Sequence, residues 1–579
     1  GKERGMDKDM FIEQAAGRAE ADLRIDNAMV ADVFSGEFFP SSVCIGQGCI
    51  LGFSRMPARE VTDAGGAYLL PGLIDGHVHI ESSMLCPARF AELVLPRGTT
   101  TVIADPHEIA NVRGVDGIRY MLEASRSLPL DVRIMLPSCV PALPFEDAGA
   151  VLRAADLAEL LDDEKVAGLG EMMNVPGVLS GDADVLEKIR AARRRGGQVD
   201  GHSPGLKGEG LDVYSAAGVG TDHECTSVEE LRDRIRRGMY VLLREGSASR
   251  DLLRLLPGVT PENSRRCLFC TDDRQPADIL ERGHMDSHLR IAVAAGLDAM
   301  SAVRMATLNA AECYGLRDRG AIAPGLRADL VLVNDLRHFQ PLRVWTGGRL
   351  AAENGMMKTA PVSLDPGELR HSVNLAPLPE QPFELRLPSG RARVISLLPH
   401  SLVTESREMD VHVSADGLFE FSRNPGMLKI AVLERHHASG RIGVGLLDGS
   451  YGLSGGAIAT SVAHDSHNIV VAGDDDADMK LAVEELARIG GGVVMTSRGK
   501  VLDCLPLPVG GLMSEKTAVE VADALRRLLR LAREHYHISE KADAFMTLSF
   551  LALPVIPRLK ITARGLFDAD AFRFVPVGA

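Results

Sequence analysis

Between about residues 69 and 315, short apolar runs alternate with amphipathic segments, and no other feature of the chain constrains the fold as strongly. The apolar run 100–104 is followed by the amphipathic segment 117–125, and the run 132–136 by the segment 154–161. Such alternation is typical of repeated βα units that build a parallel sheet. The region holds roughly 245 residues, the usual size of a (β/α)8 barrel, whose active site lies at the C-terminal ends of its strands.

The regions on either side of this barrel predict further domains, because 579 residues are too many for one hydrophobic core. Short β-like runs precede the barrel, and strand-like runs follow it at 320–333 and 343–354. We expect these two flanks to form one small β-sandwich-like domain. A proline-rich stretch at 375–382 indicates a linker to a last α+β domain. The predicted class is therefore α/β, a TIM-type barrel with two added domains, and the expected segments are 1–68, 69–315, 316–374 and 375–579.

Composition narrows the class of protein. Apolar residues make up 45% of the chain and charged residues 25%, as in an ordinary soluble globular protein. No apolar run approaches the roughly 18 residues of a membrane span, and no basic-then-apolar leader is visible, so we expect a cytoplasmic protein without a membrane partner. The nine scattered cysteines fit reduced thiols better than a disulfide framework. A formal net charge of −15 argues against nucleic acid as a partner.

The pair His77-Val78-His79 stands where the first apolar run of the barrel ends. On a strand, residues i and i+2 share a face, so both imidazoles can reach one metal ion. The polar residues that follow, from Glu81 to Ser83, suit a loop that opens from a buried strand. A histidine pair taken alone is more often an ordinary surface or core feature. The pair therefore becomes informative only together with the rest of the barrel.

Later apolar runs also end in residues that can bind metal ions. These residues are Glu171, His202, His223 and Asp272. Each has an ordinary interpretation of its own, as an acid at a helix start or as a hydrogen-bonded core histidine. Together with the histidine pair they make four imidazoles and two carboxylates, each at a strand end and in barrel order. This set suits two divalent transition-metal ions, with the imidazoles as terminal ligands and a carboxylate able to bridge.

Longer stretches around these residues give a resemblance to a known family. They are 71–83 (PGLIDGHVHIESS), 105–111 (DPHEIAN), 170–174 (GEMMN), 200–205 (DGHSPG), 222–226 (DHECT), 244–247 (REGS) and 270–274 (CTDDR). With them the chain resembles the adenine deaminases of the amidohydrolase superfamily, the bacterial type with a C-terminal extension. The resemblance continues at 463–468 (AHDSHN) and 551–557 (LALPVIP). One departure is Gln275, where a histidine is expected, but this position is not a ligand position.

The resemblance implies a reaction and a set of partners. Two metal ions, Mn(II) or Fe(II) with zinc as the alternative, would be held by His77, His79, Glu171, His202 and His223, with Asp272 beside one of them. As a hypothesis, an activated hydroxide attacks C6 of adenine, and Asp272 serves as general base and then acid, which yields hypoxanthine and ammonia in purine salvage. The implied assembly is a homo-oligomer, a dimer or larger. The candidates for binding adenine are Glu81, Ser83, His107, Glu108 and Asp273, of which Glu81 and His107 are also candidate catalytic residues.

Two other functions stay open at this point. A related amidohydrolase could cleave an amide or cyclic amide, but such enzymes usually place a carboxylated lysine between the metals, and here Glu171 takes that position. A catalytically inactive scaffold relative would be expected to have lost ligands, whereas all six positions are filled.

Two further motifs have ordinary interpretations. Cys267 and Cys270 are expected to be a buried structural pair. The run from His464 to His467 is interpreted by default as polar loop sequence, with a role in a substrate pocket, lid or interface as the alternative.

Overall fold

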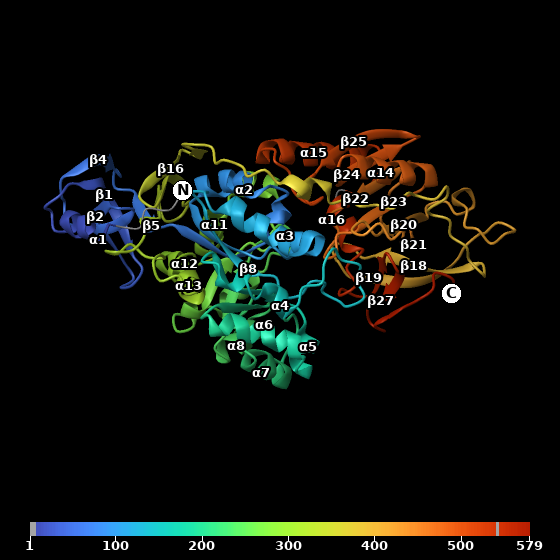
Figure 1. Cartoon of the computed structure of the whole chain (residues 1–579), viewed down its shortest axis with the longest axis horizontal. Helices are drawn as coiled ribbons and strands as arrows, with labels where there is room; N and C mark the ends of the chain where they lie inside the picture. Colours follow the sequence, from blue (N-terminus) through green and yellow to red (C-terminus); the bar gives the residue numbers. More distant parts are fainter. Residues whose placement is uncertain (1–6, 540–542) are drawn as a thin grey trace.

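The computed structural model describes residues 7–539 and 543–579, so the predicted segments 1–68 and 375–579 each include a few residues outside this description. The molecule is elongated (Figure 1). A small β domain lies at one end, the barrel in the middle, and the C-terminal domain, whose described strands lie between residues 391 and 574, at the other end. The segment limits at residues 68, 315 and 374 stay predictions. No helix of the described residues has both the length and the hydrophobicity to cross a membrane.

A (β/α)8 barrel forms the middle of the molecule, which confirms the predicted fold class. Its eight parallel strands lie in a stretch described without gaps and are β6 (Leu73–Val78), β7 (Thr99–Ala104), β8 (Asp131–Leu136), β9 (Val166–Met172), β10 (Gln198–Gly201), β11 (Thr221–Asp222), β12 (Tyr240–Arg244) and β13 (Cys267–Cys270). The β7 sequence TTTVIA is buried throughout, because strands enclosed on both faces favour β-branched and apolar residues. Cys267 and Cys270 are buried free thiols, as predicted.

Two sets of backbone hydrogen bonds close the barrel. The Gly220 amide donates to the Val199 carbonyl at 2.9 Å and joins β11 to β10. At the other seam, the Asp272 amide donates to the His77 carbonyl and the His79 amide donates to the Asp272 carbonyl, both at 2.9 Å. The first and last strands therefore meet at the predicted metal ligands.

Helices surround the barrel, as βα units require. They are α2 (Pro87–Val94), α3 (His107–Ser125), α4 (Ala154–Leu157), α5 (Val175–Ser180), α6 (Ala183–Arg194), α7 (Gly208–Ala216), α8 (Val228–Arg236), α9 (Leu252–Leu255), α10 (Pro276–Arg282), α11 (Met285–Ala294), α12 (Ala299–Met305) and α13 (Leu308–Cys313). Side-chain caps fix several of their starts, since the Asp182 carboxylate accepts from the Val185 amide at 2.9 Å and begins α6. Helix α3 begins at His107, directly after β7, and so carries His107 and Glu108 to the C-terminal end of the barrel.

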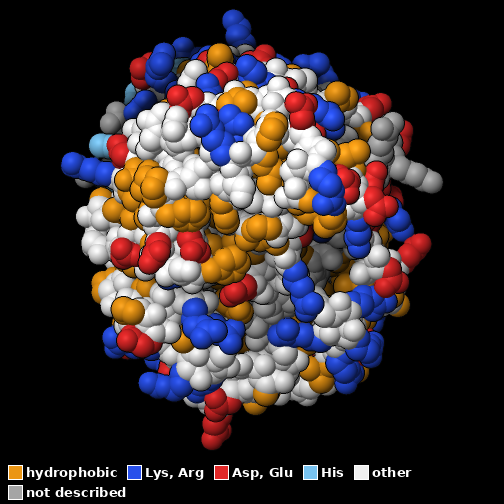
Figure 2. Space-filling model, turned by 90° about the vertical axis from the view of Figure 1, so that its left-hand side faces the viewer, with side chains coloured by type: hydrophobic (Ala, Val, Ile, Leu, Met, Phe, Trp, Pro, Cys, Tyr) orange, Lys and Arg blue, Asp and Glu red, His pale blue; other side chains and the backbone are white. Residues whose placement is uncertain are grey.

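The small β domain is built from both flanks of the barrel, as the sequence predicted. Its sheet consists of β1 (Ala21–Asp32), β2 (Glu37–Gly46), β3 (Cys49–Gly52), β4 (Ala58–Asp63), β5 (Tyr68–Pro71), β14 (Leu330–Val333), β15 (Pro341–Thr346), β16 (Arg349–Glu353) and β17 (Met356–Met357), with α1 (Lys8–Ala15) beside it. Antiparallel pairing of β14 with β5 joins the two flanks. Figure 2 looks at this end of the molecule and shows acidic and basic side chains intermixed around a group of hydrophobic ones.

The C-terminal domain contains a mixed sheet with helices packed on it. The described strands of this sheet are β18 (Arg391–Leu397), β19 (Thr404–Asp410), β20 (Leu428–Leu433), β21 (Ile442–Leu447), β22 (Ala457–Thr460), β23 (Ile469–Gly473), β24 (Gly492–Ser497) and β25 (Lys500–Pro506). Among its described residues the domain also has a smaller antiparallel sheet and three α-helices: β26 (Leu559–Thr562), β27 (Gly565–Asp568), β28 (Arg573–Phe574), α14 (Asp476–Arg488), α15 (Ala518–Glu534) and α16 (Ala544–Phe550). The domain is therefore α+β.

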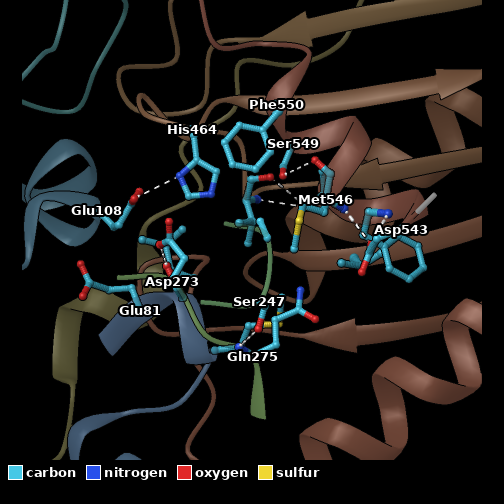
Figure 3. A pocket seen from close by; sticks show the side chains of 18 of the residues that line it. Glu81, Glu108, Ser247, Asp273, Gln275, His464, Asp543, Met546, Ser549 and Phe550 are labelled. Carbon is cyan, nitrogen blue, oxygen red and sulfur yellow. Dashed lines mark hydrogen bonds and ion pairs between the residues drawn. The ribbon is translucent and has the colours of Figure 1, made fainter. Parts of the chain in front are cut away.

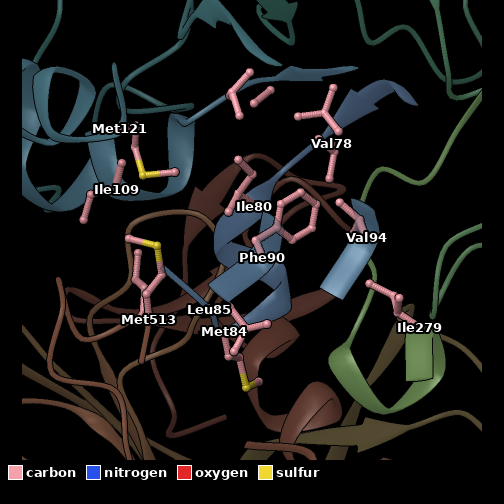
Figure 4. Packing of buried hydrophobic residues seen from close by; sticks show 14 of the residues in the cluster. Val78, Ile80, Met84, Leu85, Phe90, Val94, Ile109, Met121, Ile279 and Met513 are labelled. Atoms are coloured by element: carbon pink, nitrogen blue, oxygen red, sulfur yellow. The ribbon is translucent and has the colours of Figure 1, made fainter. Parts of the chain in front are cut away.

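The C-terminal domain shares its hydrophobic core with the barrel. Figure 4 shows Met513 of this domain close to Ile109 of α3 and Met84 of the loop after β6, within one cluster of buried side chains. Polar contacts add to this packing, because Arg564 lies 3.1 Å from Asp147 of a barrel loop. The domain is thus packed directly against the end of the barrel that carries the predicted site.

Candidate metal centre and active site

The six predicted metal ligands lie together at the C-terminal end of the barrel. Glu171 is at the centre of the group: one carboxylate oxygen, Oε2, lies 3.0 Å from His223 Nε2 and 3.1 Å from His202 Nδ1, and the other, Oε1, lies 3.3 Å from His79 Nε2. The rings of His77 and His223 stack at 4.1 Å. His77 and His79 come from the end of one strand, and each of the other side chains comes from the end of a different strand. The parallel order of the strands therefore brings the group together.

Asp272 faces the same group from the last strand. Its Oδ1 lies 3.3 Å from His77 Nε2 and 3.2 Å from His79 Nε2. Its backbone has a φ of 59°, a conformation that is uncommon outside glycine and costs energy that the surrounding structure must supply. The turn thus aims the carboxylate back at the histidines of the first strand.

The buried nitrogens of this group fit metal ions. His223 Nε2 lies 3.0 Å from Glu171 Oε2 and His77 Nε2 lies 3.3 Å from Asp272 Oδ1, but neither contact has the geometry of a hydrogen bond. These two buried nitrogens and His77 Nδ1 therefore make no hydrogen bond to any described residue. A buried polar atom without a partner is costly, and a cation would relieve that cost. His79 Nδ1 lies 2.7 Å from the Asp105 carbonyl and donates to it, which leaves the Nε2 lone pair for the group's centre. Burial would raise the Glu171 pKa, but the surrounding histidines outweigh burial and hold this pKa well below its usual range.

Two adjoining cavities open beside this group. One is lined by predicted ligands, with His107, Arg244 and Pro204. The other lies between the barrel and α16 of the C-terminal domain and is shown in Figure 3, where Glu81, Glu108 and Asp273 stand on the barrel side. The two cavities share part of their walls, namely Glu108, Ala248, Asp273, His464 and Phe550. A substrate in this space would therefore touch both domains.

Two family models match the chain, and together they cover most of it. The amidohydrolase family matches residues 68–351, and the adenine deaminase C-terminal domain matches residues 401–573. Adenine deaminase of Nitratidesulfovibrio vulgaris (strain DP4) is 61% identical over 98% of both chains. This chain belongs to the adenine deaminase family. Adenine deaminase 2 of Carboxydothermus hydrogenoformans is 49% identical over 98% of this chain and 99% of its own, and adenine deaminase of Clostridium acetobutylicum is 45% identical over 97% and 99%.

The residues that the adenine deaminase resemblance suggested for substrate binding do not all line a cavity. Glu81 lines the cavity, where its Oε2 accepts from the Ile109 amide at 3.0 Å while its Oε1 has no partner among the described residues. Burial, with help from nearby Glu108, raises the pKa of Glu81 to about 7. Asp273 also lines the cavity and accepts a hydrogen bond from Ser82.

Ser83, a predicted substrate-binding residue, does not line either cavity. Its hydroxyl donates to the Ile80 carbonyl at 2.6 Å, inside the short 3-10 turn Ile80–Ser83, and its side chain lies outside both cavities. The neighbouring Ser82 lines the cavity beside α16 instead, because consecutive residues of such a turn point in different directions.

His107 connects the metal group to Glu108. Its Nδ1 lies 3.1 Å from Glu171 Oε1, and its Nε2 lies 3.1 Å from Glu108 Oε1. The imidazole is therefore held between two carboxylates, one in the predicted ligand set and one on the cavity wall.

Sequence reasoning assigned no role to Arg244, which holds Asp272. An Arg244 guanidinium nitrogen, Nη1, donates to Asp272 Oδ2 at 2.9 Å and to Glu224 Oε1 at 2.6 Å, and Nη2 donates to Asp251 Oδ2 at 2.9 Å. A signal was present, since Arg244 ends the apolar run of β12 as the ligands end theirs. His464 and His467 of the C-terminal domain also reach the site, where both contact Glu108.

Proposed function

We propose that this protein hydrolyses adenine to hypoxanthine and ammonia. The observation that carries the proposal is the position of Asp272, whose Oδ1 lies 3.2 to 3.3 Å from both histidines of the first strand in a member of the adenine deaminase family. The proposal also includes purine salvage in the cytoplasm as the setting and a homo-oligomer as the assembly, both carried over from the family resemblance.

Two divalent metal ions belong to the proposal, and His77, His79, Glu171, His202, His223 and Asp272 would hold them. Manganese or iron fits this mixture of imidazole and carboxylate ligands, and zinc is the alternative. When bound, such ions lower the pKa of a coordinated water toward neutrality. The nitrogens of His77 and His223 that face carboxylates without a hydrogen bond to any described residue support this assignment.

Side chains of the protein then transfer the protons of the reaction. Asp272 Oδ1 takes a proton from the attacking water and later gives it to the departing amino group, while Arg244 keeps Oδ2 occupied. A C6–O bond forms and the C6–N6 bond breaks, so adenine and water give hypoxanthine and ammonia. Negative charge builds up at N1 of the ring during the attack. We assign Glu81 to N1, because its buried Oε1 on the cavity wall has no partner among the described residues and its pKa is raised to about 7, so a protonated Glu81 would donate a hydrogen bond to N1.

The cavity walls disfavour the amide-hydrolase alternative. The described residues that line the two cavities include no lysine, and Glu171 stands where such enzymes usually place a carboxylated lysine.

The test is ammonia release by the full-length protein after reconstitution with Mn(II), with adenine offered beside a cyclic amide such as dihydroorotate. We expect ammonia from adenine, loss of that activity after treatment with EDTA, and its return when Mn(II) is added back. Hydrolysis of the cyclic amide without ammonia from adenine would overturn the proposal. Turnover of adenine that survives complete removal of metal would overturn the assignment of the ligands.

A further inference from the structure

A loop of the C-terminal domain contacts the barrel, where two of its histidines bind the Glu108 carboxylate. This loop, residues 461–468, connects β22 to β23 and carries His464 and His467. His464 Nδ1 lies 3.0 Å from Glu108 Oε1, and His467 Nε2 contacts Glu108 Oε2 (Figure 3 shows the His464 contact). Both oxygens of the Glu108 carboxylate are therefore bound by histidines that follow it by more than 350 residues in the sequence.

The hydrogen bonds of His467 show whether the cluster of Glu108, His464 and His467 can bind a metal ion. The Ala463 amide donates to His467 Nδ1 at 3.0 Å, so this nitrogen carries a lone pair, and the proton of the neutral ring must sit on Nε2. A protonated Nε2 donates a hydrogen bond to Glu108 and cannot bind a metal ion. Burial lowers the pKa of His467, which agrees with a neutral ring. The cluster of Glu108 with the two histidines is thus a hydrogen-bonded clamp and not a third metal site.

His464 contributes the second donor. Burial opposes its protonation, but the Glu108 carboxylate outweighs burial and raises the pKa of His464 to about 9. A cationic imidazole and a carboxylate at 3.0 Å make a charge-assisted hydrogen bond, the stronger kind. The His464 ring also stacks on Phe550 of α16, with 4.8 Å between centroids and 15° between planes. His464 is therefore fixed on one side by Glu108 and on the other by the wall of the cavity.

The loop itself is held on several sides. Arg435, which is fully buried, donates from Nε to the His467 carbonyl at 2.6 Å and from Nη1 to the Ser372 carbonyl at 2.8 Å. Asn468 Nδ2 donates to the Asp147 carbonyl of the barrel at 2.9 Å. A loop with this many fixed points can set the position of a side chain that it touches.

We propose that His464 and His467 are positioning residues that hold the Glu108 carboxylate in the adenine site, so that the C-terminal domain completes the active site of the barrel. The inference rests on the proposed function. Because the two histidines donate to Glu108, its carboxylate stays ionised and can accept a hydrogen bond from a purine N–H group but cannot donate one. It also supports His107, which in turn lies 3.1 Å from Glu171, so the clamp acts on the metal site through two intervening side chains.

Two substitutions at position 467 separate the clamp from local loop structure. In His467→Asn the side-chain oxygen can still accept from the Ala463 amide, but nothing reaches Glu108. In His467→Gln the amide nitrogen can still donate to Glu108, but the bond from Ala463 is lost. The measurements are kcat and KM for adenine, metal content per chain and thermal midpoint, all on the full-length metal-loaded protein.

We expect His467→Asn to lower kcat by about 10- to 100-fold, the usual effect of losing a residue that orients an active-site group. Its metal content should stay at the wild-type value, and His467→Gln should restore most of kcat. Wild-type kcat in His467→Asn, or an equal loss in both variants, would overturn the clamp. Should His467→Asn fail to fold, His464→Leu against His464→Asn repeats the comparison, because Asn keeps a donor in the place of Nδ1.

The failure of the proposed function would look different. If the wild-type protein released no ammonia from adenine, the substrate would be wrong, and the clamp would then be judged by the crystal structures of wild type and His467→Asn. A Glu108 carboxylate that swings away from its wild-type position in the variant supports the clamp, and an unmoved carboxylate overturns it.

Discussion

His79 and Asp272 are joined twice, once through the backbone and once through their side chains. The His79 amide donates to the Asp272 carbonyl at 2.9 Å, and Asp272 Oδ1 lies 3.2 Å from His79 Nε2. The seam that closes the barrel is therefore also the place where the proposed base meets a proposed ligand. The backbone hydrogen bonds that close the barrel also place Asp272 beside the histidines. The geometry of Asp272 therefore depends on the stability of this seam.

Arg244 should control how well Asp272 works. Arg244→Lys keeps a positive charge but loses the guanidinium that reaches Asp272, Glu224 and Asp251 together. We expect kcat for adenine to fall about 10- to 100-fold with little change in KM, because the proposal gives the arginine the role of orienting the base and no contact with adenine. Steady-state kinetics with ammonia detection checks this, and a change confined to KM would show that Arg244 binds substrate instead.

A buried ion network away from the site should matter for stability and not for turnover. Burial opposes ionisation of Asp131, but Arg319, Arg133 and Lys165 outweigh it and hold the Asp131 pKa well below its usual range. Asp131→Asn would leave Arg319 buried without this carboxylate, at a cost of about 3 kcal/mol.

The matched control for this prediction is Asp212→Asn. It also removes a carboxylate from an arginine, but Asp212 is 61% exposed, so the loss should stay below about 1 kcal/mol. Thermal denaturation of both variants gives the comparison. Equal midpoints for the two variants would show that the buried network adds nothing.

Lys560 should make stability depend on pH. Burial lowers its pKa from 10.5 to about 7, and its ammonium donates to the Leu402 carbonyl at 2.7 Å. Below pH 7 the lysine is charged in both the folded and the unfolded state, so the folded state bears the full cost of burying the charge. As pH rises from 7 to 10.5 the unfolded state binds more protons, the cost disappears, and stability from this group increases.

The variant Lys560→Met removes that cost. It should raise the thermal midpoint most at pH 6 to 7, and its advantage over wild type should shrink toward pH 10. Lys500→Met, at an exposed position of β25, is the control and should show a constant difference. An advantage of Lys560→Met that is equally large at both ends of this range would show that the buried charge is not its cause.

Much of this architecture could be predicted from the sequence, because the strands of a barrel leave a local pattern. The apolar runs that end in Glu171, His202 and Asp272 sit on strands whose parallel order brings their ends together. Local pattern also predicted that the two flanks of the barrel build one β domain, which the pairing of β14 with β5 confirms.

Other parts of the site leave no local pattern. The contact of His467 with Glu108 joins residues 359 positions apart and depends on how the whole C-terminal domain packs on the barrel. The default interpretation of 464–467 as polar loop sequence was therefore wrong, and the alternative of a pocket or interface role fits the contacts. The sequence could not show which of Ser82 and Ser83 lines the cavity, because this depends on the geometry of the turn after His79.

The most direct test of the account is Asp272→Asn, measured for ammonia release from adenine and for metal content beside the wild-type protein. Asn keeps the size of the side chain and an oxygen for a metal ion but cannot take a proton from water. The account predicts that the wild type releases ammonia and that the variant keeps its metals yet loses turnover by roughly 100-fold or more. Wild-type rates in a fully metal-loaded variant would contradict it.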